Sequence, residues 1–314
     1  MRSMKRRIRI VVCGTGFGHA WIDAITRCRR RYQLVAIIAR GSRHSKDICH
    51  QYGVPMATSV PAVKTKIDAA IVAIGGKAGE DITNEWLIRG VPVLMEHPVS
   101  PSFIGKVQRR GESFTRIHVN GHFCDLPTVI RFIKICKRAI EPHRAFSVAV
   151  IATPRTLYSC LDIAIALLPS REMTKIRFRR PELNFLGDPE YRLGPLHLKV
   201  NLMCSTSSAD DAAGSLGGHF IQLWLPDQRI TLVGPTGPII MLGSVGHRGA
   251  TWIHSGASSA PSWYRYSVEQ RPAALIAALD RIVRNHSKSS RNEHLQRALL
   301  VSRIWDNVIH PTGF

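Results

Sequence analysis

The 314-residue sequence lacks long hydrophobic runs, and every apolar stretch is well below the roughly 20 residues that a membrane-spanning helix needs. Hydrophobic residues still make up 45% of the chain, which is enough for a large core. The basic N-terminus imitates a signal peptide only superficially, because Arg9 interrupts the apolar stretch that follows it. We therefore expect a soluble, cytoplasmic protein with no membrane partner.

Paired cysteines are also lacking. The seven cysteines are scattered along the chain and no two have a C-x-x-C spacing, so we expect reduced thiols rather than a disulfide framework. His118, His122 and Cys124 lie close together in sequence, but a structural zinc site needs four ligands in recognisable pairs. We expect no metal.

Acidic and aromatic residues are scarce. The 43 Lys and Arg residues exceed the 22 Asp and Glu residues and give a net charge of +21, while aromatics are only 7%. Such a charge attracts acidic proteins, nucleic acid or anionic membranes. The basic residues are spread over the chain, and no stacking platform or nucleic-acid module stands out. A solvated, Arg-rich surface is the simplest interpretation, and we expect no nucleic-acid partner.

The first 120 residues alternate short apolar runs with amphipathic stretches, which is typical of a parallel sheet with crossover helices. Strands are predicted over 8–13, 33–39, 69–75, 92–97 and 116–120. Helices are predicted between them, over about 17–31, 44–52, 77–89 and 101–111. The pattern predicts an N-terminal Rossmann domain.

After Asn120 several β-like runs follow one another without helices between them, which favours an α+β domain with a mostly antiparallel sheet. The predicted elements are a helix 126–140, a strand 145–152, a helix 157–168, strands 174–179, 195–205, 218–225, 228–233 and 238–243, and helices 269–286 and 290–309. Residues 206–217 and 243–262 are predicted to be loops. The fold class is α/β, with a Rossmann domain at 1–123, a substrate and oligomerisation domain at 124–290, and a C-terminal helix at 291–314 that packs back on the first domain.

A glycine-rich segment follows the first predicted strand and precedes a helix. Its residues are Gly14, Thr15, Gly16, Phe17 and Gly18. Glycines there let the backbone approach a pyrophosphate that lies over the helix N-terminus. The match to G-x-G-x-x-G is partial, since His19 stands at the third glycine position. The segment predicts a dinucleotide site, and the alternative is a tight glycine-rich turn.

The residues at the end of the second predicted strand indicate whether the cofactor is NAD(H) or NADP(H). NAD sites usually place an acidic residue there to bind the ribose 2′-hydroxyl. This sequence has instead Arg40, Gly41, Ser42 and Arg43, whose guanidinium and hydroxyl groups fit a 2′-phosphate. We predict NADP(H), and the alternative is two ordinary surface arginines.

Two further strand ends reach the same edge of the predicted sheet. Gly75 and Gly76 end the third main strand, where they either approach the cofactor or form a plain turn. Glu96, His97 and Pro98 end the next one. Histidine titrates near neutrality and can deliver a proton as a hydride arrives, so His97 is the candidate catalytic residue unless its role is structural.

Four polar residues are candidates for substrate binding. Asn120 and His122 follow the fifth strand, and Tyr158 and Asp162 open a helix beyond the domain junction. They are placed where polar groups could orient a substrate. The alternative is that Asp162 caps a helix and that Tyr158 belongs to the core.

These motifs resemble the glucose–fructose oxidoreductase and inositol dehydrogenase superfamily, in which GTGFG follows the first strand and a later strand ends in EKP. The EHP of this sequence resembles one branch, the thiazolinyl imine reductases of yersiniabactin-type and pyochelin-type siderophore biosynthesis. The matching segments are residues 34–55, 89–101, 119–120, 156–168 and 302–309, together with WYRY at 263–266.

The resemblance implies NADPH-dependent reduction of a thiazoline C=N bond to a thiazolidine on an intermediate tethered to a carrier domain of a nonribosomal peptide synthetase. It implies that His97 is the leading proton donor. Phe123 stands where the family has a tyrosine as the other donor, with His122 beside it. Glu96 and Pro98 belong to the cofactor-binding set. A basic surface would speed the encounter with an acidic carrier domain, and the protein is expected to be a homodimer.

Two other functions stay open. An NADP-dependent enzyme of the same superfamily could act on a free sugar or imine. A non-catalytic protein could use the Rossmann domain to sense NADP or could bind nucleic acid through its +21 charge.

Overall fold

The computed structural model describes residues 6–111, 116–143, 145–169, 176, 181–183, 189–203, 218–243, 250–253, 265–284 and 288–311. The chain divides into two compact units. The first unit comprises Met1–Asn120 and Pro272–Leu295, and the second comprises Gly121–Arg271 and Gln296–Phe314. Each unit is built around its own β-sheet.

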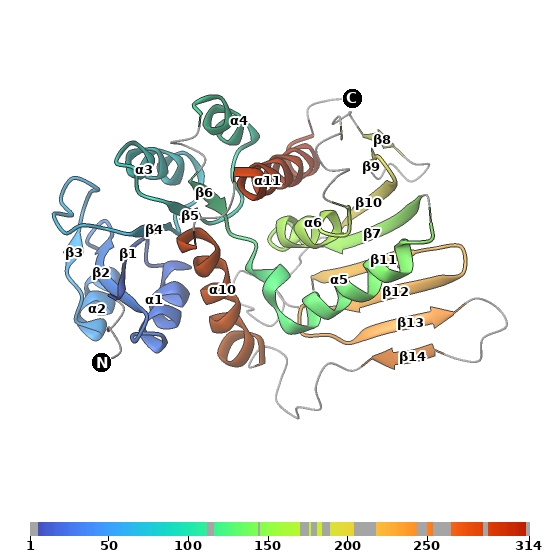
Figure 1. Cartoon of the computed structure of the whole chain (residues 1–314), viewed down its shortest axis with the longest axis horizontal. Helices are drawn as coiled ribbons and strands as arrows, with labels where there is room; N and C mark the ends of the chain where they lie inside the picture. Colours follow the sequence, from blue (N-terminus) through green and yellow to red (C-terminus); the bar gives the residue numbers. More distant parts are fainter. Residues whose placement is uncertain are drawn as a thin grey trace. The chain divides into compact units, whose positions relative to one another are not determined.

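The first unit contains a parallel sheet in the order β3-β2-β1-β4-β5-β6 (Figure 1). Its strands are β1 (Ile8–Cys13), β2 (Tyr32–Ile38), β3 (Met56–Ala57), β4 (Ala69–Val72), β5 (Val93–Met95) and β6 (Ile117–Val119). The strand order reverses between β1 and β4, and ligands of such sheets bind at the carboxyl edge of this switch point. The predicted Rossmann sheet is confirmed, with β3 as an additional short edge strand.

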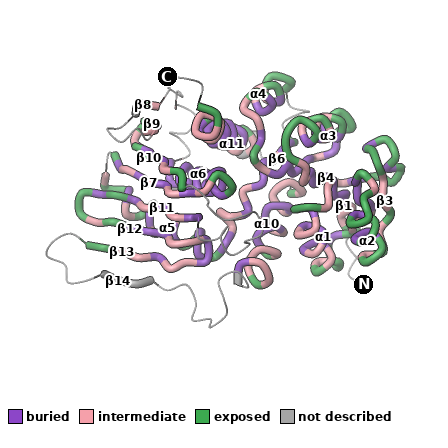
Figure 2. The backbone as a smooth tube through the Cα atoms, turned by 180° about the vertical axis from the view of Figure 1, so that it is seen from behind, coloured by how far each residue is buried: buried purple, intermediate pink, exposed green. Residues whose placement is uncertain are grey.

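Helices α1 (Gly18–Arg27), α2 (Arg43–Tyr52), α3 (Gly76–Ile88) and α4 (Pro101–Arg109) connect these strands. Helix α4 illustrates how the sequence encodes them. The Ser100 side chain accepts a hydrogen bond from the Phe103 N–H at 3.2 Å, and Pro101 occupies the first turn. Phe103, Ile104 and Val107 are buried, whereas the outer residues of α2, α3 and α4 are exposed (Figure 2).

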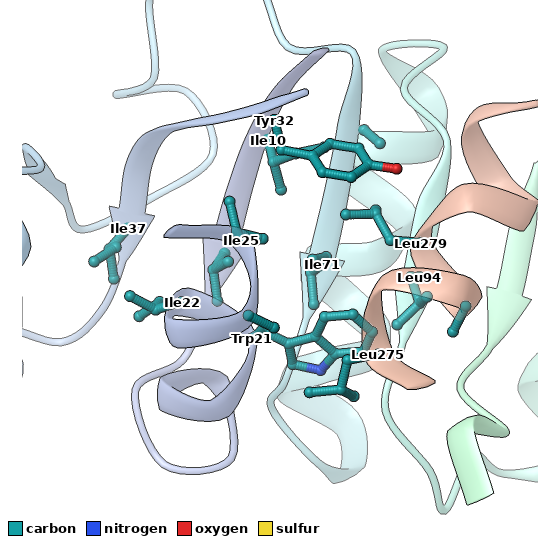
Figure 3. Packing of buried hydrophobic residues seen from close by; sticks show 14 of the residues in the cluster. Ile10, Trp21, Ile22, Ile25, Tyr32, Ile37, Ile71, Leu94, Leu275 and Leu279 are labelled. Carbon is teal, nitrogen blue, oxygen red and sulfur yellow. The ribbon is translucent and has the colours of Figure 1, made fainter. Parts of the chain in front are cut away.

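The core of the first unit includes a helix from the C-terminal part of the chain, α10 (Arg271–Val283). Leu275 and Leu279 of α10 pack with Trp21 of α1 and with the strand residues Ile71 and Leu94, all at most 1% exposed (Figure 3). The Tyr32 hydroxyl and the Arg31 guanidinium at the start of β2 both bind the Asp280 carboxylate of the same helix. The first unit is therefore completed by residues that lie more than 150 positions after β6.

The second unit contains a mixed sheet in the order β14-β13-β12-β11-β7-β10-β9-β8. Among the described strands, β7 and β10 pair in parallel and the other neighbours pair antiparallel. The strands are β7 (Phe146–Ala152), β8 (Glu182–Leu183), β9 (Pro189–Leu193), β10 (Leu196–Leu202), β11 (His219–Trp224), β12 (Gln228–Val233), β13 (Ile239–Gly243) and β14 (Ala250–Ile253). The predicted mostly antiparallel sheet is confirmed.

Helices α5 (Pro127–Ile140) and α6 (Leu157–Ile165) lie against this sheet (Figure 1). Buried and half-buried residues alternate along β7, and α6 contacts both β7 and β11. The unit also contains the short helices η2 (His122–Asp125) and η3 (Arg265–Gln270). Helix α11 (Lys288–Ile309) contributes its first residues to the first unit and the others to the second.

The division into units differs from the predicted boundaries 1–123, 124–290 and 291–314. The first break comes after Asn120, and residues 272–290 belong to the first unit because the apolar face of α10 packs on the parallel sheet. Residues 296–314, predicted to return to the first domain, belong to the second unit. The amphipathic pattern predicts these two helices, but it does not indicate which sheet each one covers.

Besides β3, three strands of the second unit are not predicted by the sequence pattern. Strands β8 and β9 are short, and β14 lies inside the segment 243–262 that was predicted to be a loop. Pairing between Ile239 of β13 and Ile253 of β14 overrides the Gly- and Ser-rich composition of that segment. The predicted loop 206–217 lies outside the described residues, as does all of the predicted strand 174–179 except residue 176.

None of the helices in the described parts of the chain combines the length and the hydropathy that a membrane span requires.

Candidate active site

The turn between β1 and α1 requires glycine at its first position. Gly14 has a φ of +94°, a conformation that other residues rarely adopt, and its N–H donates to the Ile38 carbonyl at 2.8 Å. A Cβ at this position would lie 2.7 Å from the Ala73 carbonyl oxygen, which is too close for any side chain. The turn is thereby fixed between the carboxyl ends of β1, β2 and β4.

The next two glycines have different surroundings. A Cβ on Gly16 would have no atom within 4 Å, so this position leaves open space beside the start of α1. A Cβ on Gly18 would lie 3.2 Å from Val12 Cγ1, so Gly18 allows α1 to pack closely on β1. That is the usual task of the third glycine in G-x-G-x-x-G. His19, which occupies the usual position of that glycine, places its ring Nε2 3.2 Å from the Tyr52 hydroxyl.

The N-terminus of α1 has no side-chain cap. Phe17 occupies the cap position and is 37% exposed, and Thr15 before it is half-buried. In this first turn the His19 N–H donates to the Gly16 carbonyl at 3.1 Å and the Ala20 N–H donates to the Phe17 carbonyl at 3.0 Å, while the positive end of the helix dipole still attracts an anion. Together with Gly14 and Gly16, this start has the shape and polarity that a pyrophosphate needs.

Arg40 and Arg43 are exposed after the end of β2. Gly41 between them has a φ of +83°, and the Ser42 side chain accepts a hydrogen bond from the Ser45 N–H at 3.3 Å, which caps α2. Within the described residues neither arginine forms an ion pair with a carboxylate. The structure therefore presents two guanidinium groups, neither paired with a described carboxylate, at the edge where a ribose phosphate would lie.

The loop after β4 begins α3. Gly75 is extended and caps the helix, and Gly76 has a φ of +63°. A third glycine in this segment was missed by sequence reasoning. A Cβ on Gly79 would lie 1.9 Å from the Ile74 carbonyl oxygen, so only glycine permits α3 to approach this loop. The repeated glycines of GGKAG were the available signal.

Glu96 connects three parts of the first unit. Its Oε1 accepts hydrogen bonds from Trp21 Nε1 of α1 at 2.6 Å and from Asn120 Nδ2 at 2.7 Å. Glu96 is only 7% exposed and Asn120 is fully buried. Both were predicted to bind ligand, Glu96 the cofactor and Asn120 the substrate. The structure brings their side chains together inside the unit, where they fix the ends of β5 and β6 relative to α1.

His97 follows Glu96 directly and is half-buried, and Pro98 after it is exposed. The peptide bond between them is cis. Strand β5 ends at Met95, so all three residues of EHP follow the strand, although it was predicted to continue to residue 97. The imidazole thus stands on a segment that is anchored by its buried neighbour at the carboxyl edge of the sheet.

Asp162 lies in the second unit and forms an ion pair with Arg297. Its Oδ1 accepts from Arg297 Nε at 2.7 Å, and its Oδ2 lies 3.3 Å from the Cys124 thiol. Burial, and after it the Asp162 carboxylate, raises the pKa of the Cys124 thiol. A Cβ on Gly121 would lie 2.5 Å from Asp162 Oδ2, so Gly121 is needed for this packing. Arg297 was missed by sequence reasoning, because it is 135 positions from its partner.

Tyr158 and His122 also have partners within the second unit. The Tyr158 hydroxyl lies 3.2 Å from Ser302 Oγ, and burial raises the pKa of this phenol. His122 Nε2 lies 3.1 Å from the Tyr266 hydroxyl, and the Phe123 ring stacks on Tyr266 with 5.5 Å between centroids. Tyr266 lies in the WYRY segment and was not predicted to be a site residue. Position 123 has no phenol, but the phenol of Tyr266 lies beside the Phe123 ring.

Comparisons with known proteins agree with this geometry. The profile of a family described as an oxidoreductase family with an NAD-binding Rossmann fold matches residues 8–112. A sequence comparison with curated proteins gives no significant match.

Solved structures share the fold over nearly the whole chain. A Gfo/Idh/MocA family oxidoreductase from Vibrio cholerae has a TM-score of 0.67 at 11% identity and covers 97% of this chain and 99% of its own. An oxidoreductase from Agrobacterium radiobacter in complex with NAD⁺, L-tartaric acid and magnesium has a TM-score of 0.66 at 14% identity and covers 98% and 97%. A biliverdin reductase from Synechocystis in complex with biliverdin and NADP⁺ has a TM-score of 0.64 at 14% identity and covers 96% and 98%.

These identities establish a common fold and leave substrates open. The profile match includes the glycine turn, the arginines after β2 and the EHP segment of this chain. Residues 8–112 thus match the NAD-binding Rossmann domain of the Gfo/Idh/MocA oxidoreductase family, and the whole chain has the fold of solved oxidoreductases of this family.

Proposed function

We propose that this chain is an NADPH-dependent reductase that converts a thiazoline C=N bond to a thiazolidine on a siderophore intermediate tethered to a carrier domain. The observation that carries the cofactor assignment is the acid-free end of β2, where Arg40 and Arg43 are exposed without a carboxylate partner among the described residues. The resemblance to thiazolinyl imine reductases, with His97 in place of the usual lysine, carries the choice of substrate.

The residues of the first unit fit a bound NADPH. Gly14 forms the turn, and Gly16 leaves room for the pyrophosphate beside the uncapped start of α1. Arg40 and Arg43 would hold the 2′-phosphate through charge-assisted hydrogen bonds. Ser42, Gly41 and the Gly75–Gly76 turn keep the surrounding backbone in place.

When bound, NADPH supplies the hydride that reduces the imine carbon. His97, or a water that it orients, delivers the proton to the imine nitrogen. Glu96 positions His97, because its carboxylate is held by Trp21 and Asn120. The Asp162 carboxylate is already bound by the Arg297 guanidinium, so we give it no part in the proton transfer.

We also propose that the protein works in the cytoplasm as a homodimer. One face of the sheet in the second unit carries half-buried and exposed side chains. Trp224 is 40% exposed with the Arg229 guanidinium 4.0 Å from its ring, and Leu242 is 39% exposed. An apolar face of this kind is typical of an interface between subunits.

NADPH oxidation by the purified protein tests the proposal, with a 2-aryl-thiazoline carboxylate and with a carrier-bound thiazoline as substrates. Turnover should be faster with NADPH than with NADH. Arg40→Ala should raise the KM for NADPH about 10- to 100-fold, since a hydrogen bond to a charged group contributes roughly 1.5 to 3 kcal/mol. Arg109→Ala removes an exposed arginine of α4 and should change nothing. Preference for NADH, or an Arg40 variant that behaves like the Arg109 variant, would exclude the cofactor assignment.

His97→Ala tests the proposed catalytic role. Loss of a positioned acid should lower kcat by about 100-fold or more with little change in the KM for NADPH. An unchanged kcat would remove His97 from the mechanism. Turnover of free sugars or imines without any thiazoline activity would favour the alternative, a reductase of free small molecules.

A further inference from the structure

Helix α5 presents a stripe of basic residues to the solvent. Buried residues Thr128, Val129, Phe132, Cys136 and Ile140 form one face of this helix. The opposite face carries four exposed cations and one exposed apolar residue, which are Ile130, Arg131, Lys134, Lys137 and Arg138. In the described part of the chain, α5 has the most Lys and Arg residues of any helix that has no Asp or Glu.

The first half of this stripe has no structural explanation in the helix itself. Lys137 and Arg138 lie in the last turn, where cations stabilise the negative end of the helix dipole. Arg131 and Lys134 lie in the middle of the helix, where that effect is small. Ile130 beside them is 51% exposed, so the burial of its side chain contributes little to the stability of the fold.

A hollow of about 920 Å³ continues the stripe at the C-terminal end of α5. Lys137 and Arg138 line its rim, and Glu141 and His143 also face it. Apolar side chains, among them Phe146 and Leu167, line the remainder. A basic rim beside an apolar hollow fits a partner whose acidic residues surround an apolar side chain.

We propose that the outer face of α5 is the docking surface for the acidic carrier domain that brings the substrate, an inference that rests on the proposed function. Complementary charge steers such an encounter and raises its rate by about 10- to 1000-fold. Ile130 near the start of α5 and the hollow at its C-terminal end supply the apolar contacts of the interface. The exposed residues of the stripe include no aromatic side chain on which bases could stack, so the surface fits an acidic protein better than a nucleic acid.

Charge reversal tests this surface. The variant Arg131→Glu/Lys134→Glu should lower kcat/KM for a carrier-bound thiazoline by about 10-fold or more, mainly through KM, because charges at an interface act on the association rate. Its kcat/KM for a free thiazoline analogue should equal that of the wild type. The matched control is Lys106→Glu/Arg109→Glu, which makes the same change at two exposed positions of α4 and should leave both values unchanged.

Direct binding separates the failure of this inference from the failure of the proposed function. The probe is an isolated, fluorescently labelled carrier domain of a nonribosomal peptide synthetase, without substrate. Its affinity should fall in the α5 variant but not in the α4 variant, and the loss should shrink at high salt. Equal affinities for the two variants would overturn the docking surface even if the wild type reduces thiazolines. A wild type that binds the carrier through α5 but reduces no thiazoline would overturn the reaction and keep the surface. Binding of a labelled DNA or RNA duplex that depends on α5, with no carrier binding, would overturn the choice of partner.

Discussion

Asp68, just before β4, binds two arginines from the start of the chain. Its carboxylate accepts hydrogen bonds from Arg9 N at 2.8 Å, from Arg9 Nε at 3.2 Å and from Arg6 Nη2 at 3.0 Å. Burial alone would raise the pKa of Asp68, but these hydrogen bonds outweigh it and lower the pKa to about 2. The ion pair therefore joins β1 to β4 at the edge of the sheet opposite the candidate site.

A carboxylate with a lowered pKa stabilises the fold at neutral pH and loses that effect as it is protonated. Asp68→Asn should reduce the free energy of unfolding by about 1 to 2 kcal/mol at pH 7. The difference from the wild type should persist above pH 4 and disappear as the pH falls toward 2, because the pKa drops from 3.8 to about 2 on folding. Urea denaturation at several pH values measures it. Asp81→Asn, at an exposed carboxylate paired with Lys77, should have a smaller effect, and equal effects of the two variants would contradict the explanation.

Individual site residues could be predicted where their role depends on residues that are close to them in the sequence. Gly14 was identified from a turn and has the positive φ that such a position requires, whereas Ser42, predicted as a phosphate ligand, is found to cap α2. The partners of Glu96, His122 and Asp162 were not predictable. Tyr266 is 144 positions from His122, and only the folded chain brings the two rings together. A pattern of residue types identifies a turn, but it contains no record of such distant contacts.

Helix α10 packs on a sheet whose strands lie far before it in the sequence. Leu279 is fully buried in the core of the first unit. Leu279→Ala should lower the free energy of unfolding by roughly 2 to 5 kcal/mol, through lost burial and the cavity left behind. Thermal or urea unfolding of the protein measures this loss. Ile88→Ala removes the same kind of group from a residue that is 66% exposed and should cost less than about 0.5 kcal/mol. Similar costs for both variants would mean that α10 is not part of this core.

The elements with strong periodicity were predicted almost to their ends. Strand β12 was predicted over 228–233 and is found there, and α5 begins one residue after its predicted start. Prediction was poorest for elements that exist only through pairing. The two-residue strand β3 and the strand β14 have little local signal, and each forms because a neighbouring strand offers hydrogen bonds.

At the scale of the molecule, the proposed dimer depends on the face of the sheet that carries Trp224 and Leu242. Replacing both with serine should halve the mass in solution, because burial of these two side chains stabilises the interface. Light scattering coupled to size-exclusion chromatography measures the mass. The control is Ile88→Ser, which alters a more exposed apolar residue on α3. A wild type that already has the mass of one chain would exclude the dimer.

The path of the chain between the two units also has a consequence for synthesis on the ribosome. Residues up to Asn120 emerge early, but α10 follows only after the whole sheet of the second unit. Until Leu275 and Leu279 emerge, the surface that they cover in the finished protein is exposed to water. Synthesis of the first unit therefore begins before that of the second unit but ends only after the sheet of the second unit has been made. During that time the nascent chain must stay soluble with an unfinished core.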